Sequence, residues 1–404
     1  MISREIDSGY AWFRLAISML LSALGGVGMW SVVVALPAVQ AEFGVARGGA
    51  SLPFTLTTIG FGLGGVIVGR ASDRFGIVAP VLFGACSLGV GYVLVSFAAD
   101  LWQFALIYGF FIGMFGTGST FAPLLADISR WFERRRGIAV ALCASGNYIA
   151  GAFWPPVIEY LIRTMGWRAA HFWIGLVCVS LMVPLTLLLR SSAPVRSASA
   201  AGMPAGFPRA AGVSPGALQG LLAVAGLACC VAMAMPQVHI VAYCGDLGYG
   251  TAAGAKMLSL MLSFGIISRI ASGFIADRLG GIATLAIGSA AQMAALWLYL
   301  LSDGLVQLYV ISAMFGLFQG GLVPSYAIII RENFPANETG TRVGVAMMMT
   351  MFGMALGGWL SGAIFDLTGS YRVAFMNGIA WNAVNLLIAL FLLSKTRRPV
   401  LVPG

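Results

Sequence analysis

Long stretches without a charged residue recur along this chain, and they limit what it can fold into. Eleven intervals between charged residues, including 15–41, 75–99 and 210–245, are long enough for the roughly 20 apolar residues that cross a bilayer core as a helix. A twelfth, between Lys256 and Asp277, is interrupted only by Arg269. The pattern predicts a polytopic membrane protein of about twelve helices, and it excludes a β-barrel, whose strands would alternate polar and apolar residues.

Composition supports this prediction. Apolar residues make up 59% of the 404 positions and charged residues only 9%, whereas soluble domains carry roughly 25% charge. The net charge of +9 does not indicate a nucleic-acid partner, because most basic residues fall in alternate loops, which lie on the same side of a membrane. With a cytoplasmic N-terminus, 17 of the 23 Lys and Arg lie on the cytoplasmic side, one lies within a span and five lie outside. The positive-inside rule therefore predicts an inner-membrane protein with both termini in the cytoplasm.

The chain also carries an internal repeat. Residues 190–216 are rich in Ser, Pro and Gly, and they predict a cytoplasmic linker between two six-helix bundles, 1–189 and 217–404. The sequence G-R-A-S-D-R-F-G at 69–76 returns as G-F-I-A-D-R-L-G at 273–280, 204 positions later. A tandem duplication would leave such an offset of about half the chain.

This repeated G-x-x-x-D-R-x-G loop resembles the hallmark loop of the major facilitator superfamily, here present in both halves. The resemblance implies an all-α membrane protein with the major facilitator fold, twelve transmembrane helices in two six-helix halves, and alternating access between the halves. In that family the loop helps to hold the outward-open state. We carry this gating role to Gly69, Asp73, Arg74, Gly273, Asp277 and Arg278.

Two further stretches resemble the monocarboxylate transporter and oxalate/formate antiporter branch of that superfamily. D-S-G-Y-A-W at 7–12 is similar to its entry motif, with Ser8 and Ala11 as departures. The aromatic and basic loop at 130–139, followed by the glycine spacing of 144–151, is similar to its second signature. The resemblance implies a secondary transporter of small organic anions such as lactate or pyruvate, acting as a monomer in the lipid bilayer, with protons as an additional partner left open.

Arg269 is the most informative single residue. A permanently charged guanidinium inside a span is costly unless it faces a wet cavity or a partner. The resemblance places the substrate-binding arginine of the family at this position of helix eight. The alternative is an arginine that reaches the cytoplasmic surface or pairs with an acid of the nearby loop.

The sequence also departs from the family pattern. Human-type carriers have an Asp one turn before this arginine, where this chain has Gly265, and a Lys late in helix one, where it reads M-W-S at 29–31. Proton coupling through those two groups is therefore in doubt. Residues 343–365 of helix eleven contain no Lys, Arg or His, and one cation in the cavity favours a substrate with one carboxylate.

Other titratable residues have two interpretations each. His239 is interpreted as a cavity histidine that contacts substrate or a proton, or as a packing residue, since histidine titrates near neutral pH. His171 is expected to be interfacial. Asp127 is expected to pair with Arg74 or Arg130, with a proton-carrier role as the alternative, and Glu332 is expected to pair with Arg278.

The helices that line the cavity in the resembling family supply the remaining binding-site predictions. Those candidates are Asn147, Tyr148, Trp30, Phe121, Gln319, Tyr326 and Phe352. The leading alternative function is a proton-driven drug or multidrug antiporter of the same fold, although helix five lacks the expected glycine and proline spacing. An enzyme is not expected, because the sequence has no glycine-rich nucleotide loop, metal cluster or Ser-His-Asp arrangement. We likewise expect no cofactor and no metal.

Overall fold

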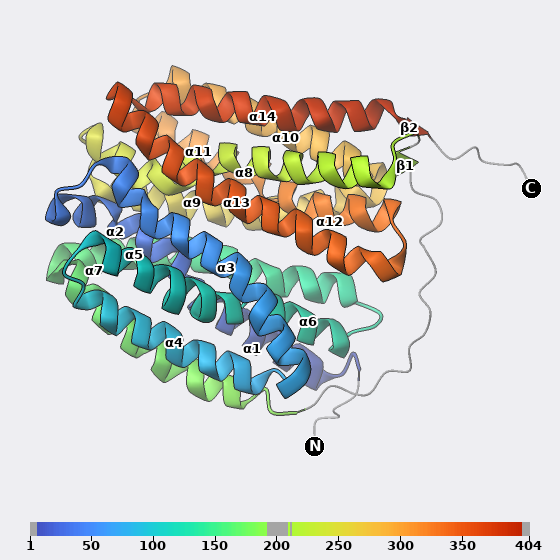
Figure 1. The fold of residues 1–404 in the computed structure, drawn as a ribbon, viewed down its shortest axis with the longest axis horizontal. Coiled ribbons are helices and arrows are strands. Elements are labelled where there is room, and N and C mark those ends of the chain that lie inside the picture. Colours follow the sequence, from blue (N-terminus) through green and yellow to red (C-terminus); the bar gives the residue numbers. More distant parts are fainter. Residues whose placement is uncertain (1–5, 192–208, 211, 398–404) are drawn as a thin grey trace, which may run out of the picture.

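The computed structural model describes residues 6–191, 209–210 and 212–397. Almost all of them form long helices that run side by side along one axis (Figure 1). The helices are α1 (Gly9–Gly25), α2 (Val27–Phe43), α3 (Arg47–Phe75), α4 (Val78–Ser96), α5 (Leu101–Ile107), the π-helix η1 (Tyr108–Thr117), α6 (Ala122–Trp131), α7 (Arg136–Leu187), α8 (Pro215–Asp246), α9 (Thr251–Leu279), α10 (Gly281–Leu301), α11 (Leu305–Gln319), α12 (Leu322–Asn333), α13 (Ala336–Thr368) and α14 (Tyr371–Ser394).

The described residues contain eleven helical stretches long and apolar enough to cross a membrane. The longest, Gly137–Leu187, has 51 residues, about 75 Å of helix and more than twice the apolar thickness of a bilayer. It bends back at Gly166, whose φ of 80° and ψ of 158° are not helical. When α7 is counted as two arms joined at Gly166, the described residues contain twelve spans, the number that the sequence predicts.

Several spans are interrupted. The first is α1 followed by α2 across Gly26, the fourth is α5, η1 and α6 together, and the tenth is α11 followed by α12. Glycine permits a close helix crossing at the fourth span, since a Cβ on Gly64 of α3 would lie 1.8 Å from the Met114 carbonyl oxygen in η1. Small residues at helix contacts are the usual means of tight packing in a membrane, where no hydrophobic driving force acts between helices.

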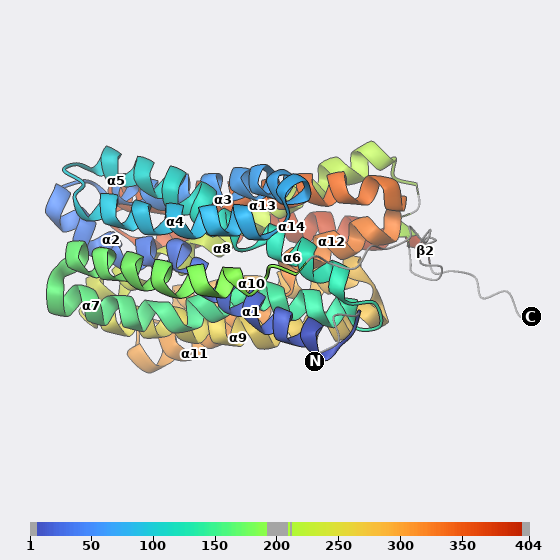
Figure 2. The ribbon, with the colours of Figure 1, turned by 90° about the horizontal axis from the view of Figure 1, so that it is seen from below.

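We call the end of the bundle that holds Gly9, Leu187, Pro215 and Ser394 the linker end, and the other end the opposite end. The first helix group, α1 to α7, and the second, α8 to α14, lie side by side (Figures 1 and 2). They touch through α3 against α13 and through α7 against α9. One of these contacts is a hydrogen bond of 3.1 Å from Thr55 Oγ1 to the Ala355 carbonyl oxygen.

The predicted linker falls partly outside the described residues, which omit 192–208 and 211. Helix α8 begins at Pro215, two positions before the predicted start of the second half, because Ser214 caps it by accepting a hydrogen bond from Ala217 N. Strand β1 (Arg209–Ala210) pairs antiparallel with β2 (Thr396–Arg397). The division into halves at 189 and 217 stays a prediction.

Candidate functional site

Arg269 lies in α9, ten residues before the helix ends, where α9 faces α7 of the first group. Its Nη1 donates a hydrogen bond of 3.1 Å to the Ala144 carbonyl oxygen, and its Cζ lies 4.5 Å from the ring centroid of Tyr148. Its Nε is buried and has no hydrogen-bond partner. Among the described residues, no carboxylate lies within the 4.0 Å of an ion pair with it. The guanidinium therefore retains an uncompensated charge and a free donor.

Gly265 makes room for this arrangement. A Cβ at this position would lie 2.3 Å from Cε1 of Tyr148, so any larger side chain would displace the ring. The same glycine stands where the resembling carriers have an acid. In this chain the space beside the arginine is filled by an aromatic face from the other helix group, and a cation over such a face is stabilised electrostatically.

Two more predicted residues lie next to Tyr148. Trp30 is buried, and its Nε1 donates to the Asn147 carbonyl oxygen at 3.4 Å. The side-chain Oδ1 of Asn147 is buried without a hydrogen-bond partner. A buried acceptor and a buried donor without partners are unusual, because each normally costs free energy. The structure thus brings Arg269, Tyr148, Asn147 and Trp30 together between the helix groups, with Arg269 Nε and Asn147 Oδ1 buried without a hydrogen-bond partner.

The other predicted lining residues have different surroundings. Phe121 packs against Phe61 with ring centroids 5.7 Å apart, and Phe352 is 37% exposed. Tyr326 is fully buried and donates its hydroxyl to Asn385 at 2.9 Å. Gln319 accepts a hydrogen bond from Gln237 Nε2 at 2.9 Å, while its own Nε2 is buried without a partner. Their roles in binding stay predictions.

His239 is not beside Arg269. It lies in α8, seven residues from the opposite end, whereas Arg269 lies ten residues from the linker end of α9. At 1.5 Å per residue in helices of this length, the two are roughly 15–20 Å apart along the bundle. His239 is fully buried, with ring nitrogens 3.0 Å from Tyr371 Oη and 2.7 Å from the Gly358 carbonyl oxygen. Of its two interpretations, direct contact with a substrate at Arg269 does not fit this position.

A cluster of charged residues that the sequence did not predict lies at the opposite end, and we call it the Arg47 cluster. Arg47, at the start of α3, binds both carboxylate oxygens of Asp246 at 3.1 Å and the Tyr371 hydroxyl at 2.7 Å. The Arg47 and Gly48 backbone N–H groups each donate to Asp366 at 2.7 Å. These contacts join the first helix group to three helices of the second, so the bundle is closed at this end. The alternation of loops across the membrane places these charges on the same side. This was the feature of the sequence that could have indicated the cluster.

The hallmark loops lie at the linker end. Asp73 pairs with Arg130 at 2.8 Å, and both side chains are more than half exposed. Arg74 lies over the Phe75 ring at 5.3 Å, while Asp277 and Arg278 are exposed. The pair joins two residues of the same helix group, in contrast to the Arg47 cluster.

Two predicted ion pairs were wrong. Asp127 does not bind Arg74 or Arg130 but accepts hydrogen bonds from Arg14 Nε and Nη2, at 2.7 and 3.0 Å. Arg14 is only 1% exposed. Glu332 does not bind Arg278 but accepts from the Gly281 backbone N–H at 3.0 Å, at the start of α10, where a negative charge suits the helix dipole.

Two other expectations also need correction. Arg269, which is half-buried, is not the only arginine enclosed within the described spans, because Arg14 in α1 and Arg47 in α3 are buried. His171 is not interfacial but fully buried, with its ring nitrogens near Tyr108 Oη and the Trp167 carbonyl oxygen.

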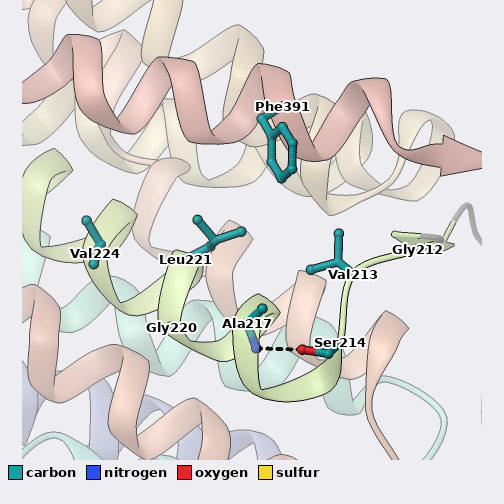
Figure 3. A pocket seen from close by; sticks show the side chains of 8 residues that line it. All are labelled: Gly212, Val213, Ser214, Ala217, Gly220, Leu221, Val224 and Phe391. Carbon is teal, nitrogen blue, oxygen red and sulfur yellow. Dashed lines mark hydrogen bonds between the residues drawn. The ribbon is translucent and has the colours of Figure 1, made fainter.

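A groove of 590 Å³ lies away from these residues, at the linker end between the start of α8 and the end of α14 (Figure 3). Phe391 of α14 points toward Leu221 and Ala217 of α8 there. All of its lining residues are uncharged, so it does not suit an organic anion.

Comparisons with known proteins agree with this architecture. The family model of the Major Facilitator Superfamily matches residues 18–306 and 284–403. Monocarboxylate transporter 13 of Bos taurus is 26% identical over 92% of this chain and 86% of its own length, and monocarboxylate transporter 11 of Homo sapiens is 27% identical over 92% and 80%. The MFS-type transporter pynF of Aspergillus niger is 25% identical over 75% and 69%.

A solved structure has the same fold. It is a bacterial homologue of the human lysosomal transporter Spinster, described as inward-facing and occupied, with a TM-score of 0.72 and 13% identity over 97% of this chain and 99% of that chain. The matched proteins are transporters, not enzymes. The chain belongs to the Major Facilitator Superfamily, as a multi-pass integral membrane protein that moves a small-molecule substrate.

Proposed function

We propose that this protein is a secondary transporter of small organic monocarboxylates, and that Arg269 binds the substrate carboxylate. The observation that carries the proposal is a guanidinium between the helix groups that has no acidic partner among the described residues and keeps a buried Nε without a hydrogen bond. A planar guanidinium binds a carboxylate through two parallel hydrogen bonds. The names of two relatives, monocarboxylate transporters 13 and 11, agree with an anionic substrate.

Transport would proceed by alternating access. The Arg47 cluster closes the opposite end, while the Asp73–Arg130 pair at the linker end stays within one helix group. If the linker end faces the cytoplasm, as the lysine and arginine distribution favours, this is a state closed to the outside. Reporter fusions at residues 200 and 250 should then score inside and outside. The reverse result would overturn the orientation in the inner membrane.

The alternative of a proton-driven drug antiporter is less well supported. Such a carrier needs an acid in its cavity to exchange a proton for a cationic or neutral drug. Around Arg269 the partners are a carbonyl oxygen and an aromatic ring. This environment favours binding of an anion.

The test is uptake of radiolabelled carboxylates into proteoliposomes, with and without a pH gradient. A hydrogen bond to a charged group contributes about 1.5–3 kcal/mol, so losing even one of the two should lower the affinity by roughly 10- to 150-fold. Arg269→Ala should fold, since it removes a costly charge from a span, and should fail to bind the anion. Arg269→Lys keeps the charge without the planar fork and should transport poorly.

Arg163→Ala is the matched control, because that arginine is 64% exposed at the opposite end and should leave uptake unchanged. Parental uptake of carboxylates by folded Arg269→Ala would refute the proposal.

A further inference from the structure

His239 is part of a directional chain of hydrogen bonds. Its Nε2 lies 2.7 Å from the Gly358 carbonyl oxygen, and a carbonyl only accepts, so Nε2 carries a proton. Its Nδ1 lies 3.0 Å from Tyr371 Oη. On the other side, Arg47 Nη1 donates to the same Oη at 2.7 Å. In a neutral imidazole whose proton is on Nε2, Nδ1 is an acceptor, and the Tyr371 hydroxyl then accepts from Arg47 and donates to Nδ1.

The hydrogen-bond partners of the imidazole are Tyr371 and Gly358, and among the described residues no carboxylate is hydrogen-bonded to it. The charged groups that act on it are Arg47 and Asp366. Both oxygens of Asp366 already accept backbone N–H groups, and Asp246 is held by Arg47. Tyr243, whose ring lies 5.5 Å from that of Tyr371, donates its own hydroxyl to Asp303.

Protonation of Nδ1 would therefore conflict with the closed cluster in two ways. The Tyr371 oxygen would face two donors, and its own hydroxyl proton would lose its acceptor. The Arg47 guanidinium would also repel the second positive charge, with little water to screen it, and Asp366 would offset only part of that repulsion. Both costs vanish when Arg47, in the first helix group, separates from Asp246, Asp366 and Tyr371 in the second.

We propose that His239 is a proton-binding site linked to the opening of the opposite end. A neutral imidazole belongs to the closed Arg47 cluster, and a protonated imidazole belongs to the state in which the cluster has separated. Linkage is reciprocal: a proton favours the open state, and opening raises the affinity for the proton. The inference rests on the proposed alternating access. It also gives the chain a titratable group, whereas Gly265 and residues 29–31 supply none where the resembling carriers have theirs.

The chain offers a matched control, since it has two histidines. His171 is also fully buried with both ring nitrogens hydrogen-bonded. Its partners, Tyr108 and Trp167, belong to the same helix group. Protonation of His171 is thus not tied to separation of the groups.

The experiment measures the distance between spin labels across the opposite end by pulsed electron resonance. The labels are placed at Ala99→Cys and Lys256→Cys, both exposed there, in a Cys86→Ser background, since the other five cysteines are buried. Samples at about pH 8 and about pH 5.5 bracket the usual titration range of histidine. We expect the long-distance population to rise at least threefold at the lower pH.

His239→Gln keeps a donor for Gly358 and cannot titrate, so its distances should be the same at both pH values, whereas His171→Gln should respond like the parent. If His239→Gln does not fold, Tyr371→Phe removes the link between Arg47 and His239 and should weaken the response. A parent without a pH response would overturn the proposal, and so would a full response in His239→Gln or in folded Tyr371→Phe. No substrate is present, so the Arg269 uptake test can fail or succeed independently.

Discussion

The buried arginines at the two ends of the bundle, Arg14 and Arg47, differ from the half-buried Arg269. Arg14 and Arg47 each bind both oxygens of a carboxylate, Asp127 and Asp246. Arg269 has a carbonyl oxygen and the Tyr148 ring. The first two charges are compensated by the protein, and the third is left for something else. Enclosure of a charge within a span therefore does not separate a binding residue from a structural one, and the proposed role of Arg269 rests on its missing partner.

The largest effect should come from breaking a compensated pair. Asp127→Ala leaves the Arg14 guanidinium, 1% exposed, without its partner, and such a buried unpaired charge destabilises a protein by about 3–5 kcal/mol. Chemical denaturation in detergent should show this loss of unfolding free energy. As a control, Asp73→Ala breaks the exposed pair with Arg130 and should cost less than about 1 kcal/mol. Equal losses in the two variants would contradict the distinction.

A second change would turn the uncompensated arginine into a compensated one. Gly265→Asp places a carboxylate one turn before Arg269, so affinity for a carboxylate substrate should fall by roughly 10- to 150-fold, equivalent to about 1.5–3 kcal/mol. Lowering the pH should restore uptake, because protonation of the new acid frees the arginine.

Gly265→Ala separates charge from size, since it also displaces the Tyr148 ring, which would lie 2.3 Å from the new Cβ. Its uptake should not depend on pH in this way. Identical pH profiles for the Asp and Ala variants would show that the added charge does not reach Arg269.

The smallest effect concerns the ring itself. Tyr148→Leu removes the aromatic face 4.5 Å from the Arg269 guanidinium, a contact that contributes about 0.5–2 kcal/mol. Substrate affinity, measured by competition uptake, should fall by about 2- to 30-fold, while Tyr148→Phe should stay close to the parent. A loss as large in Phe as in Leu would assign the effect to the hydroxyl.

The spans and the family could be predicted because they depend on local properties. The length of an apolar run decides whether it can cross a bilayer, and the two D-R loops can be recognised directly in the sequence. For Arg269, the sequence could predict only that a charged residue lies within a span, and not which groups surround it. That Tyr148 would stack on it depends on Gly265 and on the angle at which α7 meets α9, and neither is visible in one sequence.

The partners of charged residues were harder to predict. Asp127 was assigned to Arg74 or Arg130, the nearest basic residues of its own loops, but the structure gives it Arg14 of the first helix. Pairing across helices depends on which face each helix presents to its neighbour, and a one-residue difference rotates a side chain by about 100°. The π-helix η1 before Asp127 changes that rotation again.

The bend at Gly166 has a mechanical consequence. Its φ of 80° and ψ of 158° lie in a region open essentially to glycine alone, and helix continues on both sides of this one residue. A hinge needs several backbone torsions that are free to change, and a joint of one residue offers two. The arms of α7 should therefore move as a single lever. In the proposed alternating access, the arm that carries Asn147 and Tyr148 would move its half of the proposed binding site with it.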